Sequence, residues 1–428
     1  MSAISGWKTR SFSDLLKLIR NGYAGQQVAD ATDFPVSRIE TIADARIDFQ
    51  KVGYVRSIPS SYLLHEGDML FSNINSVKHI GKIAQVKRET RLYHGMNLLV
   101  MRLIDEVDKD FIFYKLNSKK TWFEQMSAQA VNQASINQVT IKGLELEIPI
   151  SKPEQTKIAE ILSTVDRAIE QTEALIAKQQ RLKTGLMQDL LTRGIDEHGN
   201  LRSEKTHQFK DSPLGRIPVE WEVKPMGQVS TLITNGFVGV ATPYYTESSD
   251  GVPYLYGNNI RCNRMDMRKL TRITRQFHER QQKSQLKPGD MLTVQSGHIG
   301  TTAVVPDDLP ESNCHALILT KFKKDLLDPN FVSFYCNFCL ETGTMGHLFV
   351  GSTIKHINTS DFAKFSIPFP SKDEQSEIAK RLLDLNLSID GSAQGLSKLR
   401  SLKTALMQDL LTGRKRVTAL LDGKEDAG

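Results

Sequence analysis

The feature that most constrains this chain is a long helical segment that occurs twice. Residues 183–192 (KTGLMQDLLT) return as residues 403–412 (KTALMQDLLT), with nine of ten positions identical at an offset of 220. The alignment extends to residues 154–192 and 374–412, where 17 of 39 positions agree. Because a repeat at a fixed period indicates duplicated structural units, we predict two copies of one plan.

Weaker matches precede both copies of the helical segment. They are LIRNGYAG at 18–25 with LITNGFVG at 232–239, GDML at 67–70 with 289–292, HIG at 79–81 with 298–300, and Ile148-Pro149 with Ile367-Pro368. The spacing between these anchors differs in the two copies, so the segments between them have diverged. Each copy is therefore predicted to hold a divergent globular part of about 150 residues, which is the size of an ordinary domain, followed by a similar helix.

Both repeated segments have the apolar spacing of a long amphipathic helix. Apolar residues recur every seven positions, with a second set four residues further on, which is typical of coiled coils. The predicted seam, which is also the expected partner-docking surface, comprises Ile158, Leu162, Val165, Ile169, Ile176, Leu186, Leu190, Ile378, Leu382, Leu385, Ile389, Leu399, Leu406 and Leu410. Further apolar positions (Ile161, Ala168, Leu175, Leu182) widen the face of the first helix, so either the globular domains or partner helices pack there.

The connection between the helices predicts their relative direction. A helix of about 39 residues spans roughly 60 Å, and a linker over residues 193–212 could barely stretch that far. An antiparallel pair needs no such connection. We therefore expect two globular domains separated by two long antiparallel coiled-coil helices, related by an approximate two-fold axis.

The globular parts have the pattern of a mixed α/β (α+β) fold. Short β-rich runs at 98–103, 291–294, 302–305 and 365–368 alternate with helical pieces at 110–116 and 330–339. The predicted domains are residues 1–152 and 213–372, the helices are 153–194 and 373–414, and a linker (195–212) and a C-terminal tail (415–428) complete the chain.

Composition excludes several classes of protein. No segment approaches the ~18 apolar residues of a membrane helix, and the N-terminus lacks the apolar core of a signal peptide. Four cysteines in 428 residues are too few for a disulfide scaffold, so we expect a cytoplasmic location. The net charge of +6 permits a polyanionic partner without identifying one.

No catalytic motif is present. The chain has no phosphate-binding loop, no dinucleotide fingerprint and no zinc-type pairing of Cys and His. Cys336 and Cys339 form a lone C-x-x-C within an apolar helical run, which favours core packing over a metal or redox site. We therefore predict no catalytic residue, no metal site and no cofactor in this chain.

Polar and basic segments at matching places in the two copies are candidate DNA contacts, because such side chains read base edges and bind phosphates. A second lead is the segment 261–283, whose eight basic and two acidic residues give a local net charge of +6. Solvated loops and a solvated basic face are the alternatives. The candidates are Asn73, Asn75, Lys78, His79, Lys82, Gln129, Asn132, Gln133, Arg261, Arg264, Arg268, Gln295, Ser296, His298, Ser352, Thr353, Lys355 and His356.

With these motifs in place, the sequence resembles the specificity subunits of type I restriction-modification systems. The resemblance covers nearly the whole chain and depends on the GDML strand entries, on Ile-Pro followed by a Glu-Gln-opened helix (148–155; 367–375), on the LMQDLLT helix ends, and on FKDSPLGRIPVEW at 209–221. The first copy departs from the pattern, because it retains only Gly6-Trp7 of the Pro-x-x-Trp entry.

The resemblance implies a non-catalytic subunit with two target recognition domains. Each domain would read one half of a bipartite asymmetric sequence in double-stranded DNA, while the helices set the spacing and dock two methyltransferase subunits. Motor-endonuclease subunits would complete the complex, and S-adenosylmethionine, ATP and magnesium would bind to partners. An alternative is a non-catalytic scaffold for protein assembly with a coiled-coil spacer.

Overall fold

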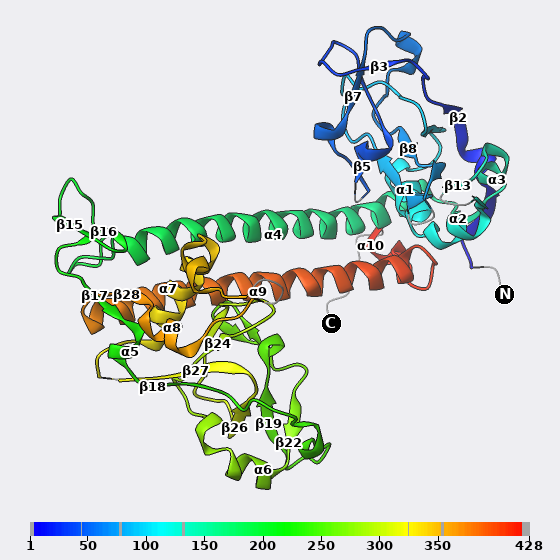
Figure 1. Ribbon diagram of the computed structural model, residues 1–428. Helices are drawn as coiled ribbons and strands as arrows, with labels where there is room; N and C mark the ends of the chain where they lie inside the picture. The colour runs from blue at the N-terminus through cyan, green and yellow to red at the C-terminus, as the bar shows by residue number, and fades with distance from the viewer. Residues whose placement is uncertain are drawn as a thin grey trace. The chain divides into compact units, whose positions relative to one another are not determined.

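The structure is a computed structural model that describes residues 4–43, 45–76, 79–130, 133–323, 325–351 and 355–421, with the backbone alone for 128–130 and 133. The chain divides into two compact units. Unit 1 comprises Met1–Glu173 and Gln394–Gly428, and unit 2 comprises Ala174–Ala393. Each unit therefore holds one globular part and a portion of both long helices (Figure 1).

Unit 1 contains a four-stranded antiparallel sheet in the order β10-β8-β11-β2. These strands are Ile83–Gln85, Met69–Phe71, Leu99–Leu103 and Leu16–Asn21. The other strands are β1 (Trp7–Ser11) with β14 (Glu145–Pro149); β12 (Ala128–Ala130), β13 (Gln133–Ser135) and β9 (Ile74–Asn75); β3 (Gln27–Val28), β7 (Gly53–Val55) and β4 (Pro35–Val36); and β5 (Ile42–Ala43) with β6 (Arg46–Ile47). Short helices are α1 (Lys109–Asn117), α2 (Lys120–Met126), α3 (Gln138–Lys142) and α10 (Thr418–Leu421).

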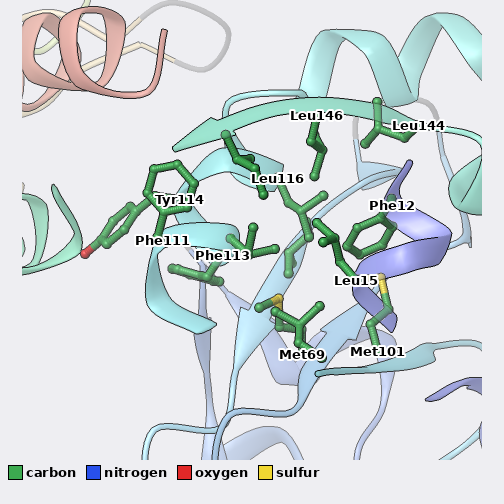
Figure 2. Close-up of a cluster of buried hydrophobic side chains, with 14 of the residues drawn as sticks. Phe12, Leu15, Met69, Met101, Phe111, Phe113, Tyr114, Leu116, Leu144 and Leu146 are labelled. Atoms are coloured by element: carbon green, nitrogen blue, oxygen red, sulfur yellow. The ribbon is translucent and has the colours of Figure 1, made fainter. Parts of the chain in front are cut away.

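One face of this sheet packs against α1 and β14. Figure 2 shows Met69 and Met101 from the sheet meeting Phe12 and Leu15 of a 3-10 turn, with Leu146 of β14 nearby. All five side chains are fully buried. Strands alternate their side chains between the two faces, and the neighbours Leu70 and Val100 belong to a second cluster on the other face. Both faces of the sheet are therefore covered.

Unit 2 repeats the central sheet with the same strand order, β18-β27-β24-β25 in place of β2-β11-β8-β10. These strands are Ser230–Asn235, Leu317–Phe322, Met291–Val294 and Thr302–Val304. The other strands are β15 (Phe209–Ser212) with β16 (Gly215–Pro218); β17 (Glu222–Pro225) with β28 (Ser366–Phe369); β22 (Thr271–Ile273), β19 (Val252–Leu255), β26 (Ser312–Cys314) and β23 (Gln285–Leu286); and β20 (Ile260–Arg261) with β21 (Arg264–Met265). Its helices include α5 (Met226–Val229), α6 (Arg275–Arg280), α7 (Pro329–Glu341) and α8 (Thr359–Lys364). The predicted mixed α/β fold and internal repeat are confirmed.

The long helices are α4 (Lys152–Thr192, 41 residues) and α9 (Lys372–Leu410, 39 residues). In unit 1, Asp166 pairs with Lys403 at 2.6 Å and Glu173 pairs with Arg400 at 2.8 Å. The position on α9 falls as the position on α4 rises, so the helices run antiparallel, as predicted. The same direction holds within unit 2, where Gln179 donates to Ser388 and residues 187–191 share a core with 378–382.

A glutamate in the first turn of each long helix is bound by an arginine that follows the other long helix. In unit 1, Glu154 accepts two hydrogen bonds from Arg416, at 2.5 and 2.8 Å. In unit 2, Glu374 accepts two from Arg202, one of them at 3.2 Å. These bidentate pairs join the start of one helix to the chain beyond the end of the other, within a single unit each time.

The next residue in each long helix is a glutamine, which hydrogen-bonds to the globular part of the same unit. Gln155 accepts a hydrogen bond from the backbone N–H of Asp108 (2.9 Å), the residue that caps α1. Gln375 does the same with Asp328 (3.0 Å), which caps α7. The Glu-Gln pair at the start of each long helix therefore has a structural role, because it joins that helix to the rest of its unit.

Candidate nucleic-acid interface

The GDML motif in each unit holds the start of a central strand. Gly67 and Gly289 have φ values of +88° and +82°, a region that favours glycine. The following Asp68 accepts from the backbone N–H of His65 (2.9 Å) and binds Arg102 bidentately (both 2.7 Å). In unit 2, the corresponding Asp290 accepts from the backbone N–H of Lys287 (2.8 Å) and pairs with Lys321. Both carboxylates are buried, so the motif anchors the strand and fixes the polar segment that leaves it.

In unit 1, the polar segment after β8 meets the segment that precedes α3. Strand β9 pairs with β13, where Asn75 lies opposite Ala134, and the N–H of Ile136 donates to the carbonyl oxygen of Asn73 at 2.9 Å. The amide of Asn75 is engaged locally, with Ser72 and with the backbone of Ser76. The fold therefore brings together two of the predicted segments, which are about 60 residues apart in the sequence. On the first of them, His79 and Lys82 are half-buried.

Unit 2 repeats this convergence with other side chains. The N–H of Ile357 donates to the carbonyl oxygen of Gln295 (3.2 Å), and the Gln295 side chain donates back to the carbonyl oxygen of Ile357 (3.0 Å). Ser296 and His298 are exposed beside it. Two further candidates, Lys355 and His356, are exposed on the second segment, where His356 exchanges two backbone hydrogen bonds with Val350.

Six of the candidates are described only in part or not at all. Lys78, Asn132, Ser352 and Thr353 lie outside the described residues. The side chains of Gln129 and Gln133 also lie outside them, although their backbones form β12 and β13.

The basic segment 261–283 is distributed over β20, β21, β22 and α6, and much of its charge is compensated. Arg261 and Arg268 share Asp266, at 3.8 and 2.7 Å. The Arg268 guanidinium hydrogen-bonds to the Asp266 carboxylate and holds the pKa of that carboxyl well below its usual range. Arg264 pairs with Asp390 of α9 at 2.7 Å, which the local count did not include. Arg268 is 87% exposed and is the best placed of the three predicted contacts to reach a phosphate.

Sequence reasoning missed several amides that the fold brings to the same places. Asn21, at the end of β2, accepts a hydrogen bond from Gln138 (3.4 Å), and Asn235, at the end of β18, accepts one from Gln295 (3.2 Å). Asn97 lies in the turn before β11 with a φ of +64°. The shared LIRNG and LITNG segments contained a signal for Asn21 and Asn235, because both asparagines occupy the same position before a glycine.

The predicted seam residues are shielded within the helix pair and its surroundings. Buried members are Ile158, Leu162, Val165, Ile169, Leu190, Ile378, Leu382 and Leu410, and half-buried members are Ile176, Leu186, Leu385, Ile389, Leu399 and Leu406. Among the additional apolar positions, Ile161 packs against the core of unit 1. In contrast, Leu175 and Leu182 are 47% and 53% exposed. The described residues therefore cover this second part of the face only in part.

The comparisons with known proteins identify the family. The family model described as "Type I restriction modification DNA specificity domain" matches residues 4–179 and 218–399. The chain belongs to this family of type I restriction-modification specificity subunits. The specificity subunit is 32% identical over 425 residues to a protein named as the type I restriction enzyme MjaX specificity subunit of Methanocaldococcus jannaschii, covering 96% of this chain and 94% of that one. It is 23% identical to the MjaVIII specificity subunit of the same organism, over 73% and 72% of the two chains.

Solved structures show the same fold. The S subunit from M. genitalium is 15% identical and superposes with a TM-score of 0.62, covering 94% of this specificity subunit and 96% of that chain. A chain from a study of complex assembly and conformational transition of the type I R-M system is 16% identical, with a TM-score of 0.53 over 96% and 99% of the two chains. Both family matches begin in a globular part and end within a long helix, so the internal repeat of the specificity subunit is a repeated specificity domain.

Other features of the specificity subunit bear on its chemistry. Cys336 and Cys339 are buried in the core of unit 2, as expected, and burial raises the pKa of the Cys339 thiol to about 11. Within the described residues, no group of three or more His, Cys, Asp or Glu side chains could hold a metal ion. None of the described helices is both long and apolar enough to cross a membrane.

Proposed function

We propose that the specificity subunit is the sequence-reading, non-catalytic subunit of its complex, and that each unit reads one half of a bipartite asymmetric DNA target. The observation that carries this proposal is that two polar segments meet in each unit, next to a central sheet that has the same strand order in both units. The scaffold is the same in both units, but unit 1 presents Asn73 and Asn75 where unit 2 presents Gln295, Ser296 and His298. Similar scaffolds with different polar side chains suit two half-sites of different sequence.

We propose further that two methyltransferase subunits dock on the long helices. Leu175 and Leu182 on α4 are seven residues apart and about half exposed, which suits a helix of a partner protein. In this arrangement the helices also set the gap between the half-sites. S-adenosylmethionine, ATP and magnesium would bind to the methyltransferase and motor-endonuclease subunits, and the reaction would take place there.

The decisive experiment measures DNA binding by the specificity subunit together with its methyltransferase partner. Sequencing of the DNA that the complex selects from a random library is expected to give one motif with two unlike half-sites and a fixed gap. Fluorescence anisotropy then measures the affinity for this motif. Affinity should fall steeply between 50 and 200 mM salt, because phosphate contacts release counterions, while sequence preference should survive competitor DNA. Salt-insensitive or absent binding would instead favour the assembly scaffold.

A pair of variants separates phosphate contacts from general charge effects. Replacing Arg268 by Gln should weaken binding to target and unrelated DNA alike, and should reduce the slope of log K against log salt by about 0.9. The matched control is Arg216→Gln, which removes another exposed arginine of unit 2, 53% exposed and paired with Glu204. The control should leave the slope unchanged. Equal slopes for both variants would exclude Arg268 as a phosphate contact.

A further inference from the structure

Unit 1 has a concavity at the place where its two polar segments converge. Its volume is about 510 Å³. It is lined by the end of β2, the segment after β8, the turn before β11 and the start of α3; the lining residues include Asn21, Asn73, Asn97, Asn137 and Gln138. Every one of these five side chains ends in a carboxamide, which both donates and accepts hydrogen bonds.

The chemistry of the lining favours a nucleic-acid base over a phosphate as the occupant. Among the described residues that line the concavity, none carries a charge. The remaining lining is small or apolar and includes Ile74, Met96 and Ile136. A phosphate group is bound best by Lys, Arg or the N-terminus of a long helix, and the helix that begins here, α3, has only five residues. Carboxamides beside apolar surface match the edge and plane of a nucleic-acid base.

Asn73 has an unused hydrogen-bond acceptor at this site. The residue is 8% exposed, and its Oδ1 atom is buried with no hydrogen-bond partner among the described residues. A buried carbonyl oxygen without a donor is costly, by about 1–3 kcal/mol, so such atoms in a folded protein call for an explanation. An N–H group supplied by a ligand would satisfy it.

At the equivalent position of unit 2, the side-chain amide is already engaged within the protein. Gln295 occupies the position of Asn73, one methylene longer, and its amide donates to Asn235 (3.2 Å) and to the carbonyl oxygen of Ile357 (3.0 Å). The NH₂ group of Gln295 thus makes contacts inside the protein, whereas the carbonyl oxygen of Asn73 has no partner among the described residues. The two units therefore differ at this position in their readiness to bind a base.

We propose that Asn73 is a specificity-determining residue of unit 1 and that the concavity receives the edge of an adenine. The inference rests on the proposed function, because it assigns one base contact to the surface described above. When the Asn73 side chain turns its carboxamide into the concavity, Oδ1 accepts the hydrogen bond of the exocyclic N6 amine and the Nδ2 group donates to N7. This is the bidentate pairing that distinguishes adenine from the other bases. Asn21, Asn97 and Gln138 surround the same space.

The test combines a protein variant with a DNA analogue, using the specificity subunit in complex with its methyltransferase partner. Sequencing of DNA selected by the wild type first gives both half-sites. Asn73→Ala should then relax one A·T position of one half-site, by about tenfold or more in discrimination, and leave the other half-site unchanged. Replacing that adenine by purine, which lacks the 6-amino group, should weaken wild-type binding and leave the binding of Asn73→Ala nearly unaltered.

Two further variants separate base reading from stability. Asn73→Asp keeps the acceptor and loses the donor, so the preference at the same position should shift toward cytosine. Gln85→Ala is the matched control, since Gln85 of β10 is also a buried amide of unit 1 with an unpaired carbonyl oxygen but lies outside the concavity. This control should keep both half-sites, whatever its effect on the unfolding midpoint.

The possible results have distinct meanings. If Asn73→Ala selects the same two half-sites as the wild type, or if the relaxed position is not an A·T pair, the assignment of Asn73 is overturned while the proposed function stands. If the wild-type complex shows no sequence preference at all, the proposed function itself fails.

Discussion

The buried ion pair at the start of α9 gives the sharpest test of how unit 2 is held together. Glu374 accepts two hydrogen bonds from Arg202, one from the backbone N–H of Ile195 (2.9 Å) and one from the indole of Trp221 (3.2 Å). The side chains of Arg202 and Glu374 are each 9% exposed. The substitution Glu374→Gln keeps the shape of the side chain and removes its charge.

The expected cost follows from what remains after the substitution. The guanidinium of Arg202 stays buried and keeps only Glu220, 4.0 Å away and 54% exposed, as a counter-charge. Each carboxylate oxygen accepts two of the four hydrogen bonds, so two donors face an amide NH₂ group in place of an oxygen. Breaking a buried pair in this way costs about 3–5 kcal/mol. Because Gln still accepts hydrogen bonds through its oxygen, we expect a value near the lower end, about 3 kcal/mol.

Tryptophan fluorescence can report unit 2 alone. The chain has three tryptophans, and Trp7 and Trp122 lie in unit 1. In a background with both replaced by Phe, Trp221 is the single reporter, and its indole is fully buried against Glu374. Urea unfolding in this background measures the change in free energy directly.

One control and one double variant complete the experiment. Glu377→Gln, one turn further along α9, removes an exposed partner of Arg381 (2.8 Å) and should cost less than about 1 kcal/mol. Adding Arg202→Met to Glu374→Gln should recover part of the loss, since no uncompensated charge is then left buried. A loss for Glu374→Gln no larger than that of Glu377→Gln would refute the reasoning.

Three further predictions concern other parts of the chain. Burial lowers the pKa of His94 to about 4, so the unfolded chain takes up the proton first as the pH falls. The free energy of unfolding should therefore fall from pH 6.5 toward pH 4, by about 2–3 kcal/mol at pH 4.5. Urea titrations of His94→Gln should lack this part of the pH dependence. Leu382→Lys buries a charge at a fully buried seam position and should cost more than about 3 kcal/mol, whereas Leu387→Lys, at a 68% exposed position, should be nearly neutral in thermal unfolding. Deleting seven residues from both long helices should change the gap between the selected half-sites, and an unaltered gap would contradict the spacing role of the helices.

Much of the architecture could be predicted from the sequence. The heptad spacing of residues such as Ile158 and Val165 is a local property, because side chains seven residues apart lie on one face of a helix whatever surrounds them. The repeat at 183–192 and 403–412 indicated two copies, and the short linker predicted the antiparallel direction. Strands and helices of strong pattern, such as β24 and α7, were also predicted to within a residue or two.

The residues that form the candidate interface could be predicted only in part. Polar segments after the GDML strands stood out because they recur in both copies. The net charge counted over 261–283 overestimated the uncompensated basic charge of this segment, because Arg264 is paired with Asp390, 126 residues away. A local sum of charge does not include a carboxylate from a distant part of the sequence.

The sequence by itself determined the duplication, the helix pair and the places where the two copies differ, because repetition and periodicity are written along the chain. Only the tertiary structure decided which polar groups are satisfied. It placed Arg416 on Glu154, 262 residues earlier, and brought Gln138 to Asn21, 117 residues earlier, in the lining of the concavity that Asn73 shares. Hydrogen bonds and burial depend on neighbours in space, and for these residues the neighbours are set by the closure of each unit.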